Sequence, residues 1–134
     1  MASVDISGPG AETVTVIPLY FQVACSDMTT AITAANDKAY FRAPVAFTAT
    51  EVRASLFTAQ TAGSIFTVDI KINGITLLST LITIDNNEKT SLTAATQPII
   101  AAAMANIAND DIITFDVTQA GTSPAGLIVT IIGG

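Results

Sequence analysis

Apolar and polar residues alternate most regularly between Ser64 and Ile84. From Phe66 to Ile72 every second residue is apolar, which is the pattern of a β-strand with one buried face. Asn73-Gly74 follows, and these two residue types accept positive φ most readily, so we predict a tight type I′ reversal there. A β-branched and leucine-rich run then returns from Ile75 to Ile84. This stretch predicts a β-hairpin at the centre of the chain.

The residues before this hairpin predict further strands. Phe47–Thr58 alternates, with Val52 and its apolar neighbours on one face and Glu51 with polar residues on the other. Thr13–Ala24 is a long apolar run interrupted by Pro18, which cannot donate to a strand ladder, so we expect an edge strand or two short strands. The remaining segments before the hairpin are a loop over Ser26–Asp37 and a short strand over Lys38–Arg42.

The residues after the hairpin predict three more strands and one segment with two possible structures. The strands are Lys89–Ala94, Ile112–Thr118 and Gly126–Ile132. Pro98–Met104 is the best local helix candidate because proline suits a first turn, and an extended crossover on the sandwich edge is the alternative. About seven to nine short strands separated by turn signals predict an all-β fold. We expect a two-sheet antiparallel β-sandwich of jelly-roll or Greek-key type.

The chain length suits one domain preceded by an N-terminal arm. With 134 residues the chain can bury one substantial core, which we assign to residues 13–134. Residues 1–12 form a polar arm with Gly8-Pro9-Gly10 as its hinge. The arm is either a frayed terminus or a segment that becomes ordered on a neighbouring subunit.

Composition indicates that part of the surface is covered by other subunits. Half of the residues are hydrophobic and only 12% are charged, against roughly 25% charged in an ordinary soluble domain. Threonine suits solvent-facing strand positions and covers some of the remaining surface. We expect the rest to be buried in an oligomer.

The charge pattern argues against nucleic acid and membrane as partners. The net charge is −6, from 11 acidic and 5 basic residues, and the basic residues are scattered, whereas phosphate binding needs them clustered. The first residues lack the basic flank and apolar core of a signal peptide. Two long uncharged stretches, Thr90–Asn109 and Val117–Gly134, are too polar to span a membrane. We expect a soluble protein made in a cytoplasm.

The residue types needed for most catalytic sites are missing. The chain has no histidine, which excludes histidine-based acid–base catalysis and Ser-His-Asp triads. Cys25 is the single cysteine, so we expect a small buried apolar side chain and neither a structural zinc site nor an intrachain disulfide.

Two weaker candidates for chemistry remain. Asp69 and Asp116 could face each other on adjacent strands as a carboxylate pair, although we favour ordinary outward-facing polar residues. The oxygen-rich loops at residues 85–88 and 109–111 do not match the calcium-loop pattern. We predict that the protein is not an enzyme and that it binds no cofactor or metal.

Several segments together resemble a small β-sandwich module found in virion structural proteins of tailed bacteriophages. The similarity covers roughly Ile17–Gly134 and includes the runs VRASL, TVDIKINGITLLSTLITID, NEKTS, AATQPII and DDIITFDVTQAGTSPAGLIVTIIG. Its most specific parts are Val68-Asp69-Ile70 with Asn73-Gly74, and Asp116-Val117-Thr118-Gln119 with Gly121. These motifs are structural, and the family has no catalytic residues to carry over.

The resemblance implies a virion component, for which two locations compete. A free-standing chain of this size looks like a capsid decoration, or cement, protein that binds the major capsid protein on the head surface as a homotrimer. The alternative is a fibre or receptor-binding tip that contacts the host. We expect decoration because no long shaft precedes the domain. The protein would be made in the host bacterial cytoplasm.

The apolar run after the arm is our candidate for attachment to the shell or to neighbouring subunits. It would be a sticky sheet edge if it were uncovered in a monomer, and Pro18 limits its pairing within its own sheet. The candidate attachment residues are Val14, Val16, Ile17, Leu19 and Tyr20. Asn73 and Gly74 are the residues that we expect the central turn to depend on.

Overall fold

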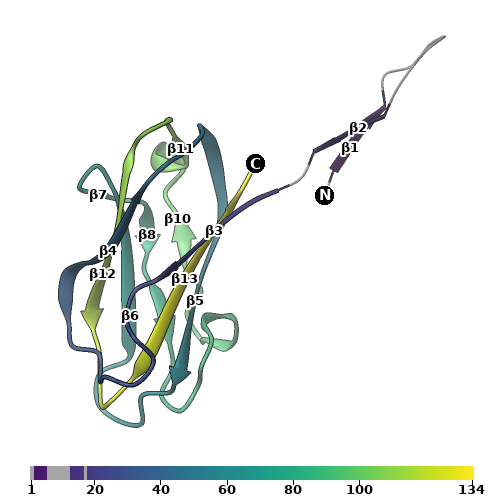
Figure 1. Cartoon of the computed structure of the whole chain (residues 1–134). Helices are drawn as coiled ribbons and strands as arrows, with labels where there is room; N and C mark the ends of the chain where they lie inside the picture. Colours follow the sequence, from purple (N-terminus) through teal and green to yellow (C-terminus); the bar gives the residue numbers. More distant parts are fainter. Residues whose placement is uncertain (1, 6–12, 17) are drawn as a thin grey trace.

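The fold contains two antiparallel sheets packed face to face (Figure 1). This computed structural model describes residues 2–5, 13–16 and 18–134, with side chains from Pro18 onward. The first sheet contains β3 (Leu19–Ala24), β5 (Phe47–Thr58), β11 (Asn106–Ile107) and β13 (Ala125–Gly133). The second contains β4 (Ala35–Arg42), β6 (Phe66–Ile72), β7 (Ile75–Thr76), β9 (Ile82–Ile84) and β12 (Ile112–Gln119).

Strand order confirms the predicted antiparallel β-sandwich. The first sheet runs β11-β5-β13-β3 and the second runs β4-β12-β6-β7, with β9 also paired to β6. Consecutive strands from β3 to β6 alternate between the two sheets, so these connections cross from one layer to the other. Such crossings are typical of Greek-key and jelly-roll sandwiches.

The core lies between the sheets and follows the alternation read from the sequence. Val52 and Val129 face inward from the first sheet, opposite Val68 and Phe115 of the second, and all four are buried. The Phe115 ring stacks on Phe41 with the ring centroids 6.2 Å apart. Burying each such side chain contributes roughly 1.5–3 kcal/mol, so the inward-facing residues of the alternating strands stabilise the packing of the two layers.

Cys25 lies in this core, as predicted. Burial raises the pKa of its thiol to about 12, because a thiolate would lose its hydration there. The side chain therefore stays protonated and behaves as a small apolar group.

The predicted reversal at Asn73-Gly74 is present. Ile72 pairs with Ile75, and the two residues between them have φ of 51° and 85°. The Asn73 side chain also reaches the start of β12, because the backbone N–H of Ile112 donates to its Oδ1 at 3.0 Å. The turn therefore anchors the hairpin to the neighbouring strand.

The return strand of the hairpin is not continuous, contrary to our expectation. It is divided into β7, β8 (Leu78–Thr80) and β9. The Leu78 N–H donates to the Thr76 hydroxyl at 3.1 Å, which makes a local turn, and Leu77 is completely buried. β8 then leaves the hairpin to pair with β10 (Ile99–Ile100).

Beyond the hairpin, the strand predicted at residues 89–94 is wrong, and the segment at residues 98–104 adopts the extended one of its two predicted structures. Residues 89–94 form a 3₁₀ turn, η1 (Ser91–Thr93), with a single bridge from Thr90 to Ser55 in place of a strand. Residues 98–104 contain β10 and a second 3₁₀ turn, η2 (Ala102–Met104), in place of a helix. The β-branched pair in β10 gains strand partners in β8, which agrees with the extended alternative.

The N-terminal segment contributes a separate pair of strands. β1 (Ala2–Asp5) pairs with β2 (Thr13–Val16), and neither strand joins the two main sheets. Figure 1 shows this hairpin beyond the end of the sandwich. The apolar run is thus divided around Pro18 into β2 and β3, one of the two expected arrangements. The hinge at residues 8–10 lies outside the described residues, and the boundary between arm and domain stays a prediction.

Candidate functional site

Three strands of the first sheet present a regular set of outward-facing side chains. In this set each β13 residue has one neighbour on β3 and one on β5. We call the set the outer sheet face. Its rows are Tyr20–Ile132–Glu51, Gln22–Thr130–Arg53 and Ala24–Ile128–Ser55.

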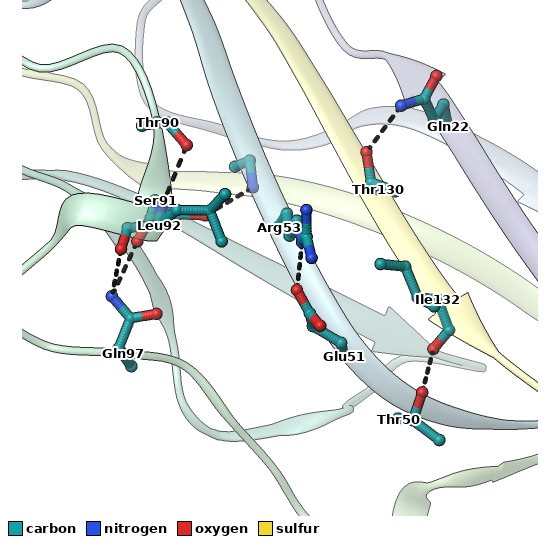
Figure 2. A network of polar contacts seen from close by, with 11 residues as sticks. Gln22, Thr50, Glu51, Arg53, Thr90, Ser91, Leu92, Gln97, Thr130 and Ile132 are labelled. Carbon is teal, nitrogen blue, oxygen red and sulfur yellow. Dashed lines mark hydrogen bonds and ion pairs between the residues drawn. The ribbon is translucent and has the colours of Figure 1, made fainter.

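Polar contacts hold this face in place and leave it electrically neutral. The Arg53 guanidinium donates a hydrogen bond to the Glu51 carboxylate (Figure 2). The positive and negative charges of the outer sheet face therefore cancel. This hydrogen bond is the main reason that the pKa of Arg53 lies above its usual value. Gln22 Nε2 donates to the Thr130 hydroxyl at 3.3 Å. The face therefore offers little charge to an ionic ligand.

Two hollows flank the Glu51–Arg53 pair. The larger, of about 570 Å³, is lined by Pro18, Tyr20, Thr50, Glu51, Arg53, Ile132, Gly133 and Gly134. The smaller, of about 390 Å³, is lined by Thr50, Glu51, Val52, Leu92, Gln97, Pro98, Ile99 and Ile100.

Large apolar side chains stand exposed among the residues that line these hollows. Tyr20 is 61% exposed beside the larger one, and Leu92 and Ile99 are 54% and 55% exposed beside the smaller one. Apolar anchors next to recesses are typical of surfaces that bind other proteins.

The turn that carries Leu92 is firmly attached to the sheet. Ser91 is buried, and its hydroxyl accepts a hydrogen bond from the backbone N–H of Ala54 at 3.0 Å. Gln97 Nε2 donates to the carbonyl of Ser91 at 3.0 Å (Figure 2), and it also donates to the carbonyl of Ala94 at 2.8 Å. These bonds satisfy backbone groups of η1 and hold Leu92 toward solvent.

A second cluster lies on the outer side of the other sheet. Asp69 of β6 is directly opposite Asp116 of β12, and they are only 7% and 1% exposed. Lys71 Nζ lies 2.9 Å from Asp116 Oδ2, and the backbone N–H of Asp37 donates to Asp116 Oδ1 at 2.7 Å. The Thr76 hydroxyl donates to Asp69. Both aspartates thus lie on the outward side of their strands and face each other, and these groups cover them from solvent.

The partners of the aspartates indicate what this cluster can do. Both oxygens of Asp116 are already bonded, so its carboxylate is held as an internal ion pair. The pKa of Lys71 is raised, first by its hydrogen bond to Asp116 and then by that carboxylate's charge. Among the described residues no three His, Cys, Asp or Glu side chains are placed to hold a metal ion.

Comparison with known proteins gives no match. No protein-family model, curated protein or solved structure matches this chain. The resemblance to bacteriophage structural modules therefore stays a prediction, and the all-β antiparallel fold is its confirmed part. In the part of the chain that the structure describes, no helix is long and apolar enough to cross a membrane.

The candidate attachment residues occupy different surroundings. Tyr20 belongs to the outer sheet face, whereas the neighbouring Leu19 packs against the core. Val14 and Val16 lie in β2, opposite β1 residues. Ile17 lies outside the described residues. The attachment role of the set stays a prediction.

Sequence reasoning missed most of the outer sheet face. The alternation on β5 did place Glu51 and Arg53 together on the face opposite Val52. It gave no sign that Thr130 and Gln22 would continue their row, because these neighbours come from the two ends of the chain. Leu92 was missed because a strand was predicted where η1 forms.

Proposed function

We propose that this chain is a structural protein of a tailed bacteriophage virion, in the role of a capsid decoration protein. It binds the major capsid protein on the head surface as a homotrimer, after synthesis in the host bacterial cytoplasm. The observation that carries the proposal is the outer sheet face, with exposed Tyr20 and two adjoining hollows.

This surface suits a protein partner better than an ionic ligand. Its single pair of opposite charges is internally compensated, while the chain as a whole carries −6. Large apolar side chains that fill pockets on a partner contribute most of the binding energy in typical protein interfaces. A shell protein or a second copy could supply the complementary surface.

The buried Asp69–Asp116 pair supports a structural role. These carboxylates are bonded within the domain, because Lys71 and the β4 backbone bind Asp116 and the Thr76 hydroxyl donates to Asp69. We propose that they stabilise the outer side of the second sheet and that the protein is not an enzyme. It needs no cofactor and no nucleic acid in this role.

Binding to purified heads tests the proposal against its alternative, a tip that contacts the host. The full chain is mixed separately with heads depleted of it and with host cells, and each sample is sedimented. We expect the chain to sediment with heads and to stay in solution with cells. Sedimentation with cells alone would replace decoration by receptor binding, and sedimentation with neither would contradict both.

The two tyrosines of the chain provide a matched pair of variants for this experiment. Tyr20 lies on the outer sheet face, whereas Tyr40 lies on β4 in the other sheet and is 68% exposed. We expect Tyr20→Ser to weaken head binding roughly tenfold, as for a typical interface anchor. Tyr40→Ser should leave it unchanged. Equal losses in both variants would exclude the outer sheet face as the binding surface.

A further inference from the structure

β3 is an edge strand with an open side. It pairs with β13 on one side and has no second neighbour among the described residues. Cys25, just beyond β3, donates its N–H to Leu127 at 2.9 Å. Because backbone groups in antiparallel strands point to alternate sides, Phe21 and Val23 also bond toward β13. The N–H and C=O groups that point away from the sheet belong to Tyr20, Gln22 and Ala24.

The other sheet edges carry features that discourage further pairing, and β3 does not. β7 and β11 have only two residues each, and β9, whose one strand partner among the described residues is β6, has only three. β4 carries the charged residues Asp37, Lys38 and Arg42, and its register with β12 is irregular. β3 has six residues without charge or proline, and its pairing with β13 is regular. Short length, charge and bulges are the usual protections of an edge strand, so β3 is the unprotected one.

We infer that the open side of β3 binds the β2 strand of a second copy of this chain. β2 has the sequence TVTV, in which β-branched residues favour an extended strand. Its only strand partner in the described part of the chain is β1. A two-stranded hairpin is marginally stable alone, and addition to a large sheet would stabilise it.

The chain's own β3 is a poor partner for its β2. Only residues 17 and 18 separate the two strands. A two-residue type I′ hairpin turn needs positive φ at both positions, and the Pro18 ring fixes φ near −65°. β2 therefore reaches a β3 edge more readily in another copy. This is a head-to-tail contact, which closes into a ring when the rotation between copies allows it.

The exchanged strand would add to the sheet that carries the outer sheet face. Tyr20 lines the larger hollow, and its backbone points to the open side of β3. A strand added here would lie next to that hollow. The inference deepens the oligomeric part of the proposed function, and it rests on that proposal only in assuming that copies associate.

Proline substitution at Gln22 tests the inference, with Tyr40→Pro as the matched control. Both positions are exposed, and their N–H groups point away from the sheet. On β4 the N–H of Ala43 donates to the Asp111 carbonyl, so every second residue back from it bonds toward β12 and Tyr40, three positions away, points to the open side. Proline is tolerated where the N–H of an edge strand faces solvent. We expect sedimentation velocity to show trimers for the native full chain and for Tyr40→Pro, and monomers for Gln22→Pro at the same micromolar concentration. Native monomers, or trimers of Gln22→Pro, would overturn the inference.

A photo-cross-linker at position 22 of the full chain identifies the occupant and does not depend on tolerance of proline. We expect irradiation to join position 22 to residues 2–16 of a second copy, as determined by mass spectrometry of isotopically mixed chains. Cross-links to β3 of the second copy, or no intermolecular cross-links, would overturn the inference. Head binding is measured separately, so intact trimers that ignore heads would count against the proposed function alone.

Discussion

Gln60 shows how much a single buried residue contributes to this fold. It is completely buried, and its side chain connects three loops at one end of the sandwich. Gln60 Nε2 donates to the Ser64 carbonyl at 2.9 Å and also reaches Asn86, while its Oε1 accepts from the Thr122 N–H at 3.2 Å. Gly121 packs against it so closely that any added Cβ would overlap the amide.

Gly121→Ala and Gly74→Ala separate the cost of this overlap from backbone strain. Both glycines have positive φ, but a Cβ on Gly74 would meet no atom within 4 Å. We expect Gly74→Ala to cost about 1–2 kcal/mol, from backbone strain alone. Gly121→Ala should cost about 1–3 kcal/mol more, because Gln60 must move. Denaturant unfolding measures both values, and equal values would contradict the packing described for Gln60.

Lys71 gives the fold a dependence on alkaline pH. Its pKa in the folded chain lies above the ordinary 10.5, because Asp116 favours the charged form. The Lys71–Asp116 pair therefore stabilises the fold fully below pH 10.5, the pKa of an ordinary lysine. This stabilisation is lost as the pH rises through the higher pKa that Lys71 has in the folded chain. We expect the difference in unfolding free energy between the native chain and Lys71→Met to shrink above pH 10.5.

Lys89→Met is the control for this measurement, since Lys89 is exposed and removed from the acidic pair. The difference in unfolding free energy between Lys89→Met and the native chain should not shrink above pH 10.5. A Lys71→Met difference that stays constant through strongly alkaline pH would show that the ion pair does not stabilise the fold.

At the scale of elements, local patterns predicted the long strands well. β5 was predicted with its observed bounds, because twelve residues carry a clear alternation. The Asn73-Gly74 turn was predicted because its conformation depends on its own residues. In contrast, η1 depends on the distant contact between Ser91 and Ala54, and β10 depends on β8. No local pattern contains these contacts.

Ser91→Ala tests whether η1 is secured to β5 as described. The change removes the acceptor for the buried Ala54 N–H, and an unpaired buried donor costs about 1–3 kcal/mol. Ser79→Ala makes the same chemical change at an exposed hydroxyl and should change stability by less than about 0.5 kcal/mol. Thermal unfolding compares the two. Similar small effects would show that water or another group replaces Ser91.

For the whole molecule, composition led us to expect a surface covered by other subunits, which stays a prediction, and it gave no location for that surface. The low charge indicated burial against other subunits. The outer sheet face combines β3, β5 and β13, and the row of Tyr20, Ile132 and Glu51 joins residues from the start, middle and end of the chain. The position of this face follows from strand order, which depends on the long-range packing of both sheets.

The central claim is that the protein decorates a bacteriophage head as a trimer. Electron cryo-microscopy of the intact virion tests it most directly, because one reconstruction reports location and copy number together. We predict groups of three sandwiches on the outer surface of the shell, with the outer sheet face turned toward a neighbouring copy or the capsid protein. Sandwich density confined to the tail, or single copies with that face open to solvent, would contradict the claim.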